Sequence, residues 1–517
     1  MRLLVTLLAG ATWMLAACGG GSGPLLSAGG SPVETGGTTV TASSLSAAIT
    51  PAGPALDPSA AVVVQFDARV DPGSLQLTGT LAPLAGAQGW STGGNVLTLA
   101  PPAGGWPRGL NATLDVQASG ANGTAMGSPA SARFVVPLQL STGSAALAAV
   151  GQPTLGTAND LPFGAPTAQS LKGVYGSPAI TPDGRLFIAD YGNSRVLGYP
   201  SLPGASGATA DLVLGQADFT SVTGGTPTQN RLSQPTQISI GGGRLSVADF
   251  GNSRVLLWNS VPSASGALPD VVLGQSGFTS NSGGCGANRL NFPESALLAP
   301  GGKLIVADTE NHRVLVWNSV PTASGAAPDL VIGQGSLTRC RRNDDNQDNV
   351  ADPAPSARTL YRPGGVWSDG RRLVVNDRDN NRVLVWNTFP TANFQPADLV
   401  LGQGSFTTGA ANDDDQNGVL DSNPSARTLR QPYGGVHSNG VQLAIGDSGN
   451  NRVLVWNSFP TASFQPADAV LGQSGFGTAA PGTSATTMNM PTGVLFHQDK
   501  LLVSDRNNHR LLVLQSP

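Results

Sequence analysis

The hydrophobic residues in the second half of the chain form short runs that recur in a fixed order. One run reads Arg-Val-Leu-Val-Trp or a close variant and follows an aspartate by five positions; its six copies lie at 190–199, 249–258, 308–317, 377–386, 447–456 and 505–514. The run is apolar almost throughout, which is typical of a strand that is buried on both faces. Each repeat of 58 to 70 residues also holds two earlier apolar runs and a later one that ends in Gly-Gln. Four short strands per repeat predict a propeller blade.

The spacing of the repeats predicts where the loops lie. From each motif aspartate to the next repeat glutamine the distance is 26 residues, whereas the distance onward to the next aspartate is 33 after Gln216 and 44 after Gln403. In an antiparallel blade this variable connection and the turn after the aspartate lie at the same end. We therefore expect the insertions and the motif turns to share one face, where binding residues usually lie. The last repeat has no Gly-Gln run of its own, so residues 145–153 are expected to close its blade.

These repeats resemble NHL repeats, in which an opening proline, an apolar strand ending in aspartate and an Asn-x-Arg-Val strand follow one another. The resemblance covers about residues 145 to 514. It implies an all-β fold with a six-bladed β-propeller of four strands per blade over residues 145–517.

Residues 40–137 show a different pattern of short alternating strands, such as 62–66 and 95–99, separated by Gly- and Pro-containing turns. About seven such strands predict a β-sandwich. The segment resembles the bacterial Ig-like domains of envelope proteins. It contains no cysteine, so the inter-sheet disulfide of antibody domains is absent.

The first 18 residues have the composition of a targeting segment, with Arg2 followed by an apolar run. The run ends in Leu-Ala-Ala-Cys18-Gly, which resembles a bacterial lipobox and implies lipidation of Cys18. The alternative is an ordinary signal peptide with an incidental cysteine. Residues 19–39 are rich in Gly, Ser and Thr, which predicts a flexible tether. The expected location is the cell envelope, with a lipid anchor in the membrane; Gly19 after the cysteine favours the outer membrane.

Composition narrows the class of partner. Charged residues make up 12% of the chain and the net charge is −4, with 68 Gly and 39 Pro. This composition is typical of strands and tight turns, and the lack of a basic stripe argues against a nucleic-acid partner.

The repeated aspartate and arginine of the motif are predicted to be structural, because a ligand site would break the repeat symmetry. An arginine fork can pair with an aspartate that also binds the backbone of a turn. The pairs are Asp190 and Arg195, Asp249 and Arg254, Asp308 and Arg313, Asp377 and Arg382, Asp447 and Arg452, and Asp505 and Arg510.

Two long loops place oxygen-bearing side chains at positions 1, 3, 5 and 9 of a common spacing. The residues are Asp413, Asp415, Asn417 and Asp421 in one loop and Asp344, Asn346, Asp348 and Asp352 in the other. This spacing lets a loop wrap a hard cation, and it resembles the calcium loops of EF-hands and thrombospondin-type repeats. A proline stands where an EF-hand has its bidentate acid, which predicts weak affinity. The alternative is a solvated acidic turn.

Cys285 and Cys340 lie in successive connections between blades. An even pair outside the cytoplasm predicts a disulfide, and two free thiols are the alternative.

These features favour an envelope protein whose propeller is a binding platform for a protein, peptide or glycan. An enzyme is the rival, because similar propellers include lactonases and amidating lyases with a metal in the central channel. That class needs carboxylate, Asn or His side chains on the first strands, and these strands read as bland runs such as Gly-Gly-Val. A third alternative is a structural surface or adhesion component. No residue is assigned a catalytic role.

Overall fold

The computed structural model describes residues 44–222 and 225–516 of the chain. The expected targeting segment with Cys18 and the expected tether lie outside these residues. Within the described part, no helix is both long enough and apolar enough to cross a membrane.

Residues 47–135 form two antiparallel sheets whose inner faces share one hydrophobic core. The alternation that the sequence predicts is present, since Val62, Val64 and Phe66 are buried while Gln65 is exposed. The strands, in sheet order, are β1 (Ala47–Thr50), β2 (Val62–Phe66), β5 (Val96–Leu99) and β4 (Gln88–Trp90), then β3 (Gln76–Thr78), β6 (Asn111–Gln117) and β7 (Ala130–Val135), with the 3-10 turns η1 (Pro72–Ser74) and η2 (Ala82–Leu84) between them.

Residues 146–515 form six four-stranded antiparallel sheets in the described part of the chain. Their strands are β9 (Ala179–Ile180), β10 (Leu186–Asp190), β11 (Arg195–Tyr199) and β12 (Leu212–Leu214); β13 (Pro235–Gly241), β14 (Arg244–Asp249), β15 (Arg254–Trp258) and β16 (Val271–Leu273); β17 (Pro293–Ala299), β18 (Lys303–Asp308), β19 (Arg313–Trp317) and β20 (Leu330–Ile332); β21 (Pro363–Ser368), β22 (Leu373–Asp377), β23 (Arg382–Trp386) and β24 (Leu399–Leu401); β25 (Val436–Ser438), β26 (Leu443–Asp447), β27 (Arg452–Trp456) and β28 (Ala469–Leu471); and β29 (Pro491–His497), β30 (Lys500–Asp505), β31 (Arg510–Gln515) and β8 (Ala146–Val150).

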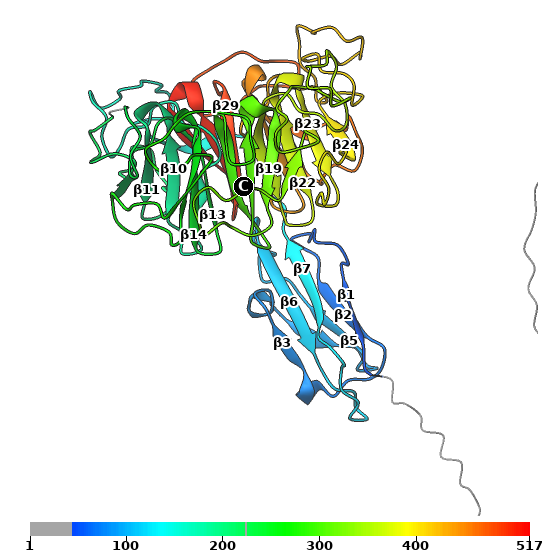
Figure 1. The fold of residues 1–517 in the computed structure, drawn as a ribbon. Coiled ribbons are helices and arrows are strands. Elements are labelled where there is room, and N and C mark those ends of the chain that lie inside the picture. The colour runs from blue at the N-terminus through cyan, green and yellow to red at the C-terminus, as the bar shows by residue number, and fades with distance from the viewer. Residues whose placement is uncertain (1–43, 223–224, 517) are drawn as a thin grey trace, which may run out of the picture. The chain divides into compact units, whose positions relative to one another are not determined.

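The six sheets are arranged in a ring. The first strands of neighbouring sheets contact one another in chain order from β9 to β29. The order closes because the Oγ of Ser177, two residues before Ala179, donates a hydrogen bond of 2.8 Å to the carbonyl of Val494 in β29. The third strands are buried along their whole length, as their apolar composition predicts, except for the last residue of β31. Sheets packed face to face around one axis are a β-propeller, and Figure 1 shows them side by side.

A 3-10 turn follows each motif aspartate, and these turns lie at one end of the sheets, uppermost in Figure 1. The turns are η3 (Tyr191–Asn193), η4 (Phe250–Asn252), η5 (Thr309–Asn311), η6 (Arg378–Asn380), η7 (Ser448–Asn450) and η8 (Arg506–Asn508). The next residue has a positive φ, 55° at His312 and 51° at Asn381, a conformation that Asn and His adopt more readily than most residues. His312 Nδ1 accepts the N–H of Arg362 at 3.2 Å, and Asn381 Oδ1 accepts that of Gln431 at 2.9 Å. Each turn thereby holds the chain that enters the next blade.

The last sheet is completed by β8, which precedes all the other blades in the chain. Val150 pairs with Leu511 and Ala148 with Val513 in antiparallel register. The strand lies within residues 145–153, the segment to which the spacing assigns this place. Joining the two ends of the repeat region in one sheet leaves no free radial edge.

The opening proline of the first blade lies in a different register from those of most other blades. Pro235 opens its strand opposite the motif residue Asp249, and the prolines of most other blades do the same. In the first blade Ala179 pairs with Phe187, so Pro178 lies beside the middle of β10 and away from its aspartate end. Proline has no N–H to donate, which agrees with the short β9.

Candidate functional site

The six motif ion pairs lie inside the sheets and are satisfied by the protein itself. In the third blade Arg313 Nε donates to Asp308 Oδ2 at 2.8 Å, and both side chains are fully buried. The other aspartate oxygen accepts the N–H of Asn291 at 2.7 Å, while the two terminal guanidinium nitrogens donate to carbonyls that include those of Leu337 and Gly286. Burial raises the pKa of Asp308, and the guanidinium opposes this shift. The same pairing recurs in the other five copies. This network stabilises the turns and leaves no donor for a ligand.

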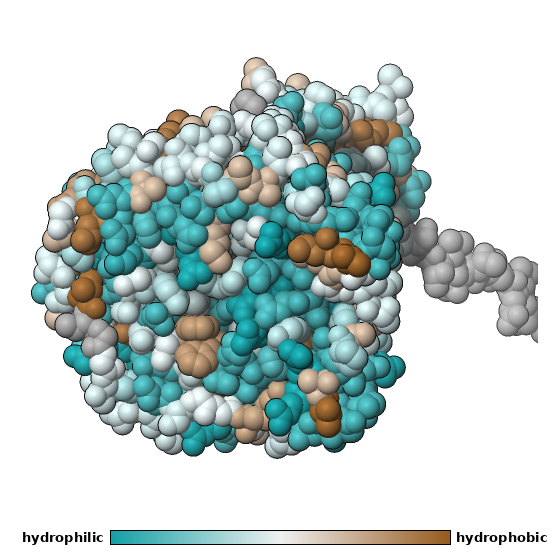
Figure 2. Space-filling model, turned by 90° about the horizontal axis from the view of Figure 1, so that it is seen from above, coloured by the Kyte–Doolittle hydropathy of each residue, from teal (hydrophilic) through white to brown (hydrophobic). Residues whose placement is uncertain are grey.

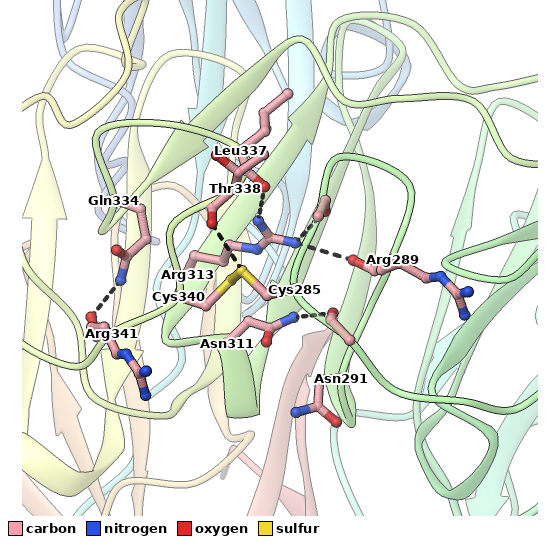
Figure 3. Close-up of a disulfide and its surroundings, with 12 residues drawn as sticks. Cys285, Arg289, Asn291, Asn311, Arg313, Gln334, Leu337, Thr338, Cys340 and Arg341 are labelled. Atoms are coloured by element: carbon pink, nitrogen blue, oxygen red, sulfur yellow. Dashed lines mark hydrogen bonds between the residues drawn. A yellow bond between two sulfur atoms is a disulfide. The ribbon is translucent and has the colours of Figure 1, made fainter. Parts of the chain in front are cut away.

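A disulfide joins Cys285 and Cys340, with 6.1 Å between their Cα atoms. Figure 3 shows it beside Arg313, whose guanidinium binds the carbonyl of Leu337 in one of the two bridged loops and that of Arg289 in the other. The disulfide and the motif arginine therefore fasten the same two connections between blades.

The two acidic loops have nearly identical hydrogen bonds. Asp413 Oδ1 and Oδ2 accept the N–H groups of Asn417 and Gly418, each at 2.9 Å. Asp344 accepts the corresponding pair from Asp348 and Asn349, each at 3.0 Å. Position 9 closes both loops, since Asp421 accepts the N–H of Asp414 and Asp352 that of Asp345.

The two loops differ in how their carboxylates gather. Asp413, Asp415 and Asp421 bring ligand atoms within 4.8 Å of one another, and within the described residues this is the one such group of three or more Asp, Glu, His or Cys side chains. In the other loop Arg339 Nη1 lies 3.6 Å from Asp344 Oδ2. Thr408 takes the place of Arg339 in the loop with the gathered carboxylates. In the loop of Asp344 the Arg339 guanidinium therefore offsets part of the negative charge. The loop of Asp413 has no such arginine, and its carboxylates lie close together.

Both acidic loops contact the motif turns directly, as the spacing predicts. Asn343 and Asn380 exchange hydrogen bonds of 3.1 and 2.9 Å, and Asn412 and Asn450 exchange bonds of 3.1 and 2.8 Å. The insertions and the turns therefore share one face, which we call the motif-turn face. Figure 2 shows the molecule from this side as mainly hydrophilic, with separate hydrophobic groups. Large apolar side chains are exposed at the loop tips: Val350, Val419 and Leu420.

A charged and aromatic cluster closes the propeller axis on the motif-turn face. Glu294, directly after the opening proline of β17, is 3% exposed. Its Oε1 pairs with Arg378, and its Oε2 accepts the hydroxyl of Tyr175 at 2.9 Å. Burial raises the pKa of both Glu294 and Tyr175. The expectation of uniformly bland first strands is therefore wrong at this position. The signal was available, because the residue after the opening proline is an acid in one blade only.

The first strands line a cavity toward the opposite face, with apolar side chains that include Ile240, Leu298 and Trp367. His437 also lines it, and burial lowers the pKa of this histidine to about 4. Its Nδ1 accepts the N–H of Phe496 at 3.3 Å. This histidine is thus held neutral and hydrogen-bonded by its own propeller.

Comparisons with known proteins support the class of fold. The family model described as NHL repeat matches residues 290–317. No curated protein matches the chain. Together with the ring of sheets, this match identifies residues 146–515 as a β-propeller that contains an NHL repeat.

Similar solved structures include three proteins of different kinds. The PQQ-bound aldose sugar dehydrogenase from Streptomyces coelicolor is 14% identical with a TM-score of 0.37, covering 68% of this chain and 96% of its own. Streptogramin B lyase is 11% identical with a TM-score of 0.34, covering 86% and 99%. The nidogen/laminin complex is 15% identical with a TM-score of 0.31, covering 58% and 85%. At these values the similarities carry no argument about activity or ligand.

Proposed function

We propose that this chain is a lipid-anchored protein of the bacterial cell envelope that presents a six-bladed NHL-type propeller as a binding platform for a protein, peptide or glycan. The six sheets between residues 146 and 515 would be its blades. The two sheets of residues 47–135 would be an Ig-like spacer between the anchor and the platform. The observation that carries the proposal is that the two inserted loops lie on the motif-turn face, against the turns of a rigid scaffold.

Calcium is the proposed organiser of the inserted loops. Carboxylate and amide oxygens at this spacing suit a hard cation, and Asp413, Asp415 and Asp421 already lie close together. Neutralising three like charges would hold the exposed tip of Val419 and Leu420 in one orientation. The loop of Asp344 would bind calcium more weakly, because the positive charge of Arg339 beside Asp344 would repel the ion.

In this proposal a lipid on Cys18 anchors the protein in the membrane. A Cys18→Ser change should move the protein from the membrane fraction to the soluble fraction without altering its thermal melting. Retention in the membrane fraction would contradict lipid anchoring at this residue.

The enzyme alternative receives less support from the axis. Glu294 is a carboxylate at the place where an axial metal would need one, but Arg378 and Tyr175 bind both of its oxygens. The inserted loops, in contrast, expose apolar tips at Val350, Val419 and Leu420. Binding is therefore the function that the geometry supports best.

The proposal is tested by screening the full chain, purified in mild detergent, against glycan and peptide arrays with calcium and with chelator. We expect selective binding that weakens in the double variant Val419→Ser/Leu420→Ser. The matched control is Arg371→Gln, an exposed residue between the first and second strands of its blade, on the opposite face. Absence of selective binding, or equal loss in the control, would overturn the platform.

A further inference from the structure

The residue after each motif aspartate changes widely in size and character from blade to blade. It opens the 3-10 turn, and several of its side chains meet at the axis. The six residues are Tyr191, Phe250, Thr309, Arg378, Ser448 and Arg506. Because small polar residues serve as well as rings and guanidiniums, the fold of the turn does not require the large side chains. Their presence at the axis therefore calls for another explanation.

No carboxylate of the described residues lies within ion-pair distance of Arg506, although its charge reaches Glu294 and opposes the burial that raises the pKa of that acid. Its guanidinium carbon lies 5.0 Å from the ring centroid of Tyr175 and 5.3 Å from that of Tyr191. Within the described chain its guanidinium makes one hydrogen bond, a contact of 3.7 Å from Nη1 to the sulfur of Met490. None of its nitrogens is buried without a partner, so its remaining donors face solvent.

Arg378 offers a comparison within the same protein, since it occupies the same turn position. Its guanidinium pairs with Glu294 and, at 3.0 Å, with Asp379. Glu294 and Asp379 are thus already taken up by another arginine. The positive charge that remains open at the axis is that of Arg506.

An aromatic surface continues from Arg506 across the first three blades. The ring centroids of Tyr191 and Phe250 are 6.4 Å apart, and those of Phe250 and Phe292 are 4.9 Å apart. Phe292 is 38% exposed, whereas Tyr175 beneath the surface is 4% exposed. We call this group of Arg506, Tyr191, Phe250 and Phe292 the axial mouth. It combines a guanidinium that has no ion pair with rigid aromatic rings, and the buried Tyr175 lies beneath the guanidinium.

We propose that the axial mouth binds a carboxylate carried on a ring. The planar fork of Arg506 would hold the carboxylate through two parallel hydrogen bonds, a geometry that lysine cannot provide. Its position over two tyrosine rings limits the orientations of the fork before a ligand arrives. The exposed ring of Phe292 and the half-buried rings of Tyr191 and Phe250 supply apolar area against which the ring of the ligand packs. This inference rests on the proposed binding platform and names the ligand chemistry of its centre.

Two kinds of molecule carry this chemistry, a sugar acid and an aromatic acid. The test is calorimetric titration of the full chain in mild detergent with glucuronate, benzoate and the neutral sugar glucose. We expect at least one acid to bind with a Kd of about 10 mM or tighter, and glucose not to bind. Stronger binding of glucuronate identifies a sugar acid as the source, and stronger binding of benzoate an aromatic acid.

Two variants assign the binding to the axial mouth. Arg506→Gln should weaken the acid at least about tenfold, and Arg506→Lys should weaken it less, since the charge remains without the fork. The matched control is Arg430→Gln, an exposed arginine beside η7 that has no aromatic ring beneath it in the described structure; it should change the Kd less than about twofold. Unchanged melting temperatures show that the variants fold.

Three results would overturn the axial site: no saturable binding of either acid, equal binding of glucose, or undiminished binding by Arg506→Gln. The array screen separates this failure from that of the platform. If array ligands still bind and respond to the loop variant, the axial site alone is wrong. If neither array ligands nor acids bind, the platform itself is wrong.

Discussion

Glu294 accepts a hydrogen bond of 2.9 Å from the hydroxyl of Tyr175, although the two residues are 119 positions apart and belong to different blades. The same carboxylate pairs with Arg378, which belongs to the fourth blade. The invariant residues of the repeat hold each blade together, whereas this cluster, which occurs once, links blades across the axis. The side chains that meet at the axis on the motif-turn face therefore do not follow the repeat symmetry.

Replacing Glu294 with glutamine should destabilise the propeller. Arg378 would keep its contact with Asp379 but lose its buried counter-charge, and breaking one partner from a buried pair typically costs about 3 kcal/mol or more. Thermal melting measures the loss. The control is Glu310→Gln, whose carboxylate pairs with Arg362 in a more exposed setting and should have a small effect. Equal shifts for both variants would contradict a special role of the axial carboxylate.

Replacing Arg339 with threonine should create a stronger calcium site in the loop of Asp344. Threonine is the residue at the corresponding position of the other loop, and the change removes a guanidinium 3.6 Å from Asp344. Calorimetry should detect one ion bound by the loop of Asp413 in the parent protein and a second in the variant.

Asp415→Asn is the companion variant, and it should abolish the site that the parent already has. Binding that survives Asp415→Asn, or an Arg339→Thr variant identical to the parent, would contradict this assignment of the two loops.

The melting temperature should fall as the pH falls from 7 toward 5, and His312 contributes to this fall. Burial, followed by the nearby Arg362, lowers the pKa of His312 to about 4 from its usual 6.5. Between these values the unfolded chain binds a proton that the folded chain does not, so acid favours unfolding. This loss of unfolding free energy is complete only near pH 4, where it can reach about 3 kcal/mol.

His312→Asn isolates this contribution, because Asn381 makes the same bond to the next blade in its own repeat. The variant should lose less stability than the parent when both are melted at neutral and at mildly acidic pH. If the melting temperatures of the two proteins fall equally between neutral and mildly acidic pH, His312 does not titrate in this range.

Removing the disulfide with Cys285→Ser/Cys340→Ser should lower stability while the two loops keep their positions. The bridge closes a segment of 55 residues, for which chain entropy predicts up to about 4 kcal/mol. Arg313 still binds carbonyls of both loops, so hydrogen exchange there should rise only modestly. A large rise in exchange would show that the disulfide, and not the arginine, positions the loops.

The repeated parts of the fold could be predicted because each role appears six times in the sequence. The aspartate, the arginine and the apolar third strand recur at fixed spacing, and the missing Gly-Gln run pointed to β8. The register of Pro178 could not be predicted, because proximity to an apolar run does not fix strand register.

The axial residues were missed for the opposite reason. Glu294, Arg378 and Arg506 each depart from the repeat, and a pattern built from shared positions passes over them. Their convergence depends on the closure of the ring, which brings residues from separate blades to one axis. The difference in charge between the two acidic loops was missed as well, because it depends on the three-dimensional contact of Arg339 with Asp344.

Hydrogen exchange, read by mass spectrometry with and without the ligand that the arrays select, tests most directly whether the motif-turn face is the binding face. We expect protection in peptides that cover the turns at 191–194, 250–253 and 506–509 and the loop at 412–428. We expect no change at 241–244, 300–303 and 369–372, where first and second strands join on the opposite face. Protection confined to those connections would place the ligand on the other side of the propeller and contradict binding at the motif-turn face.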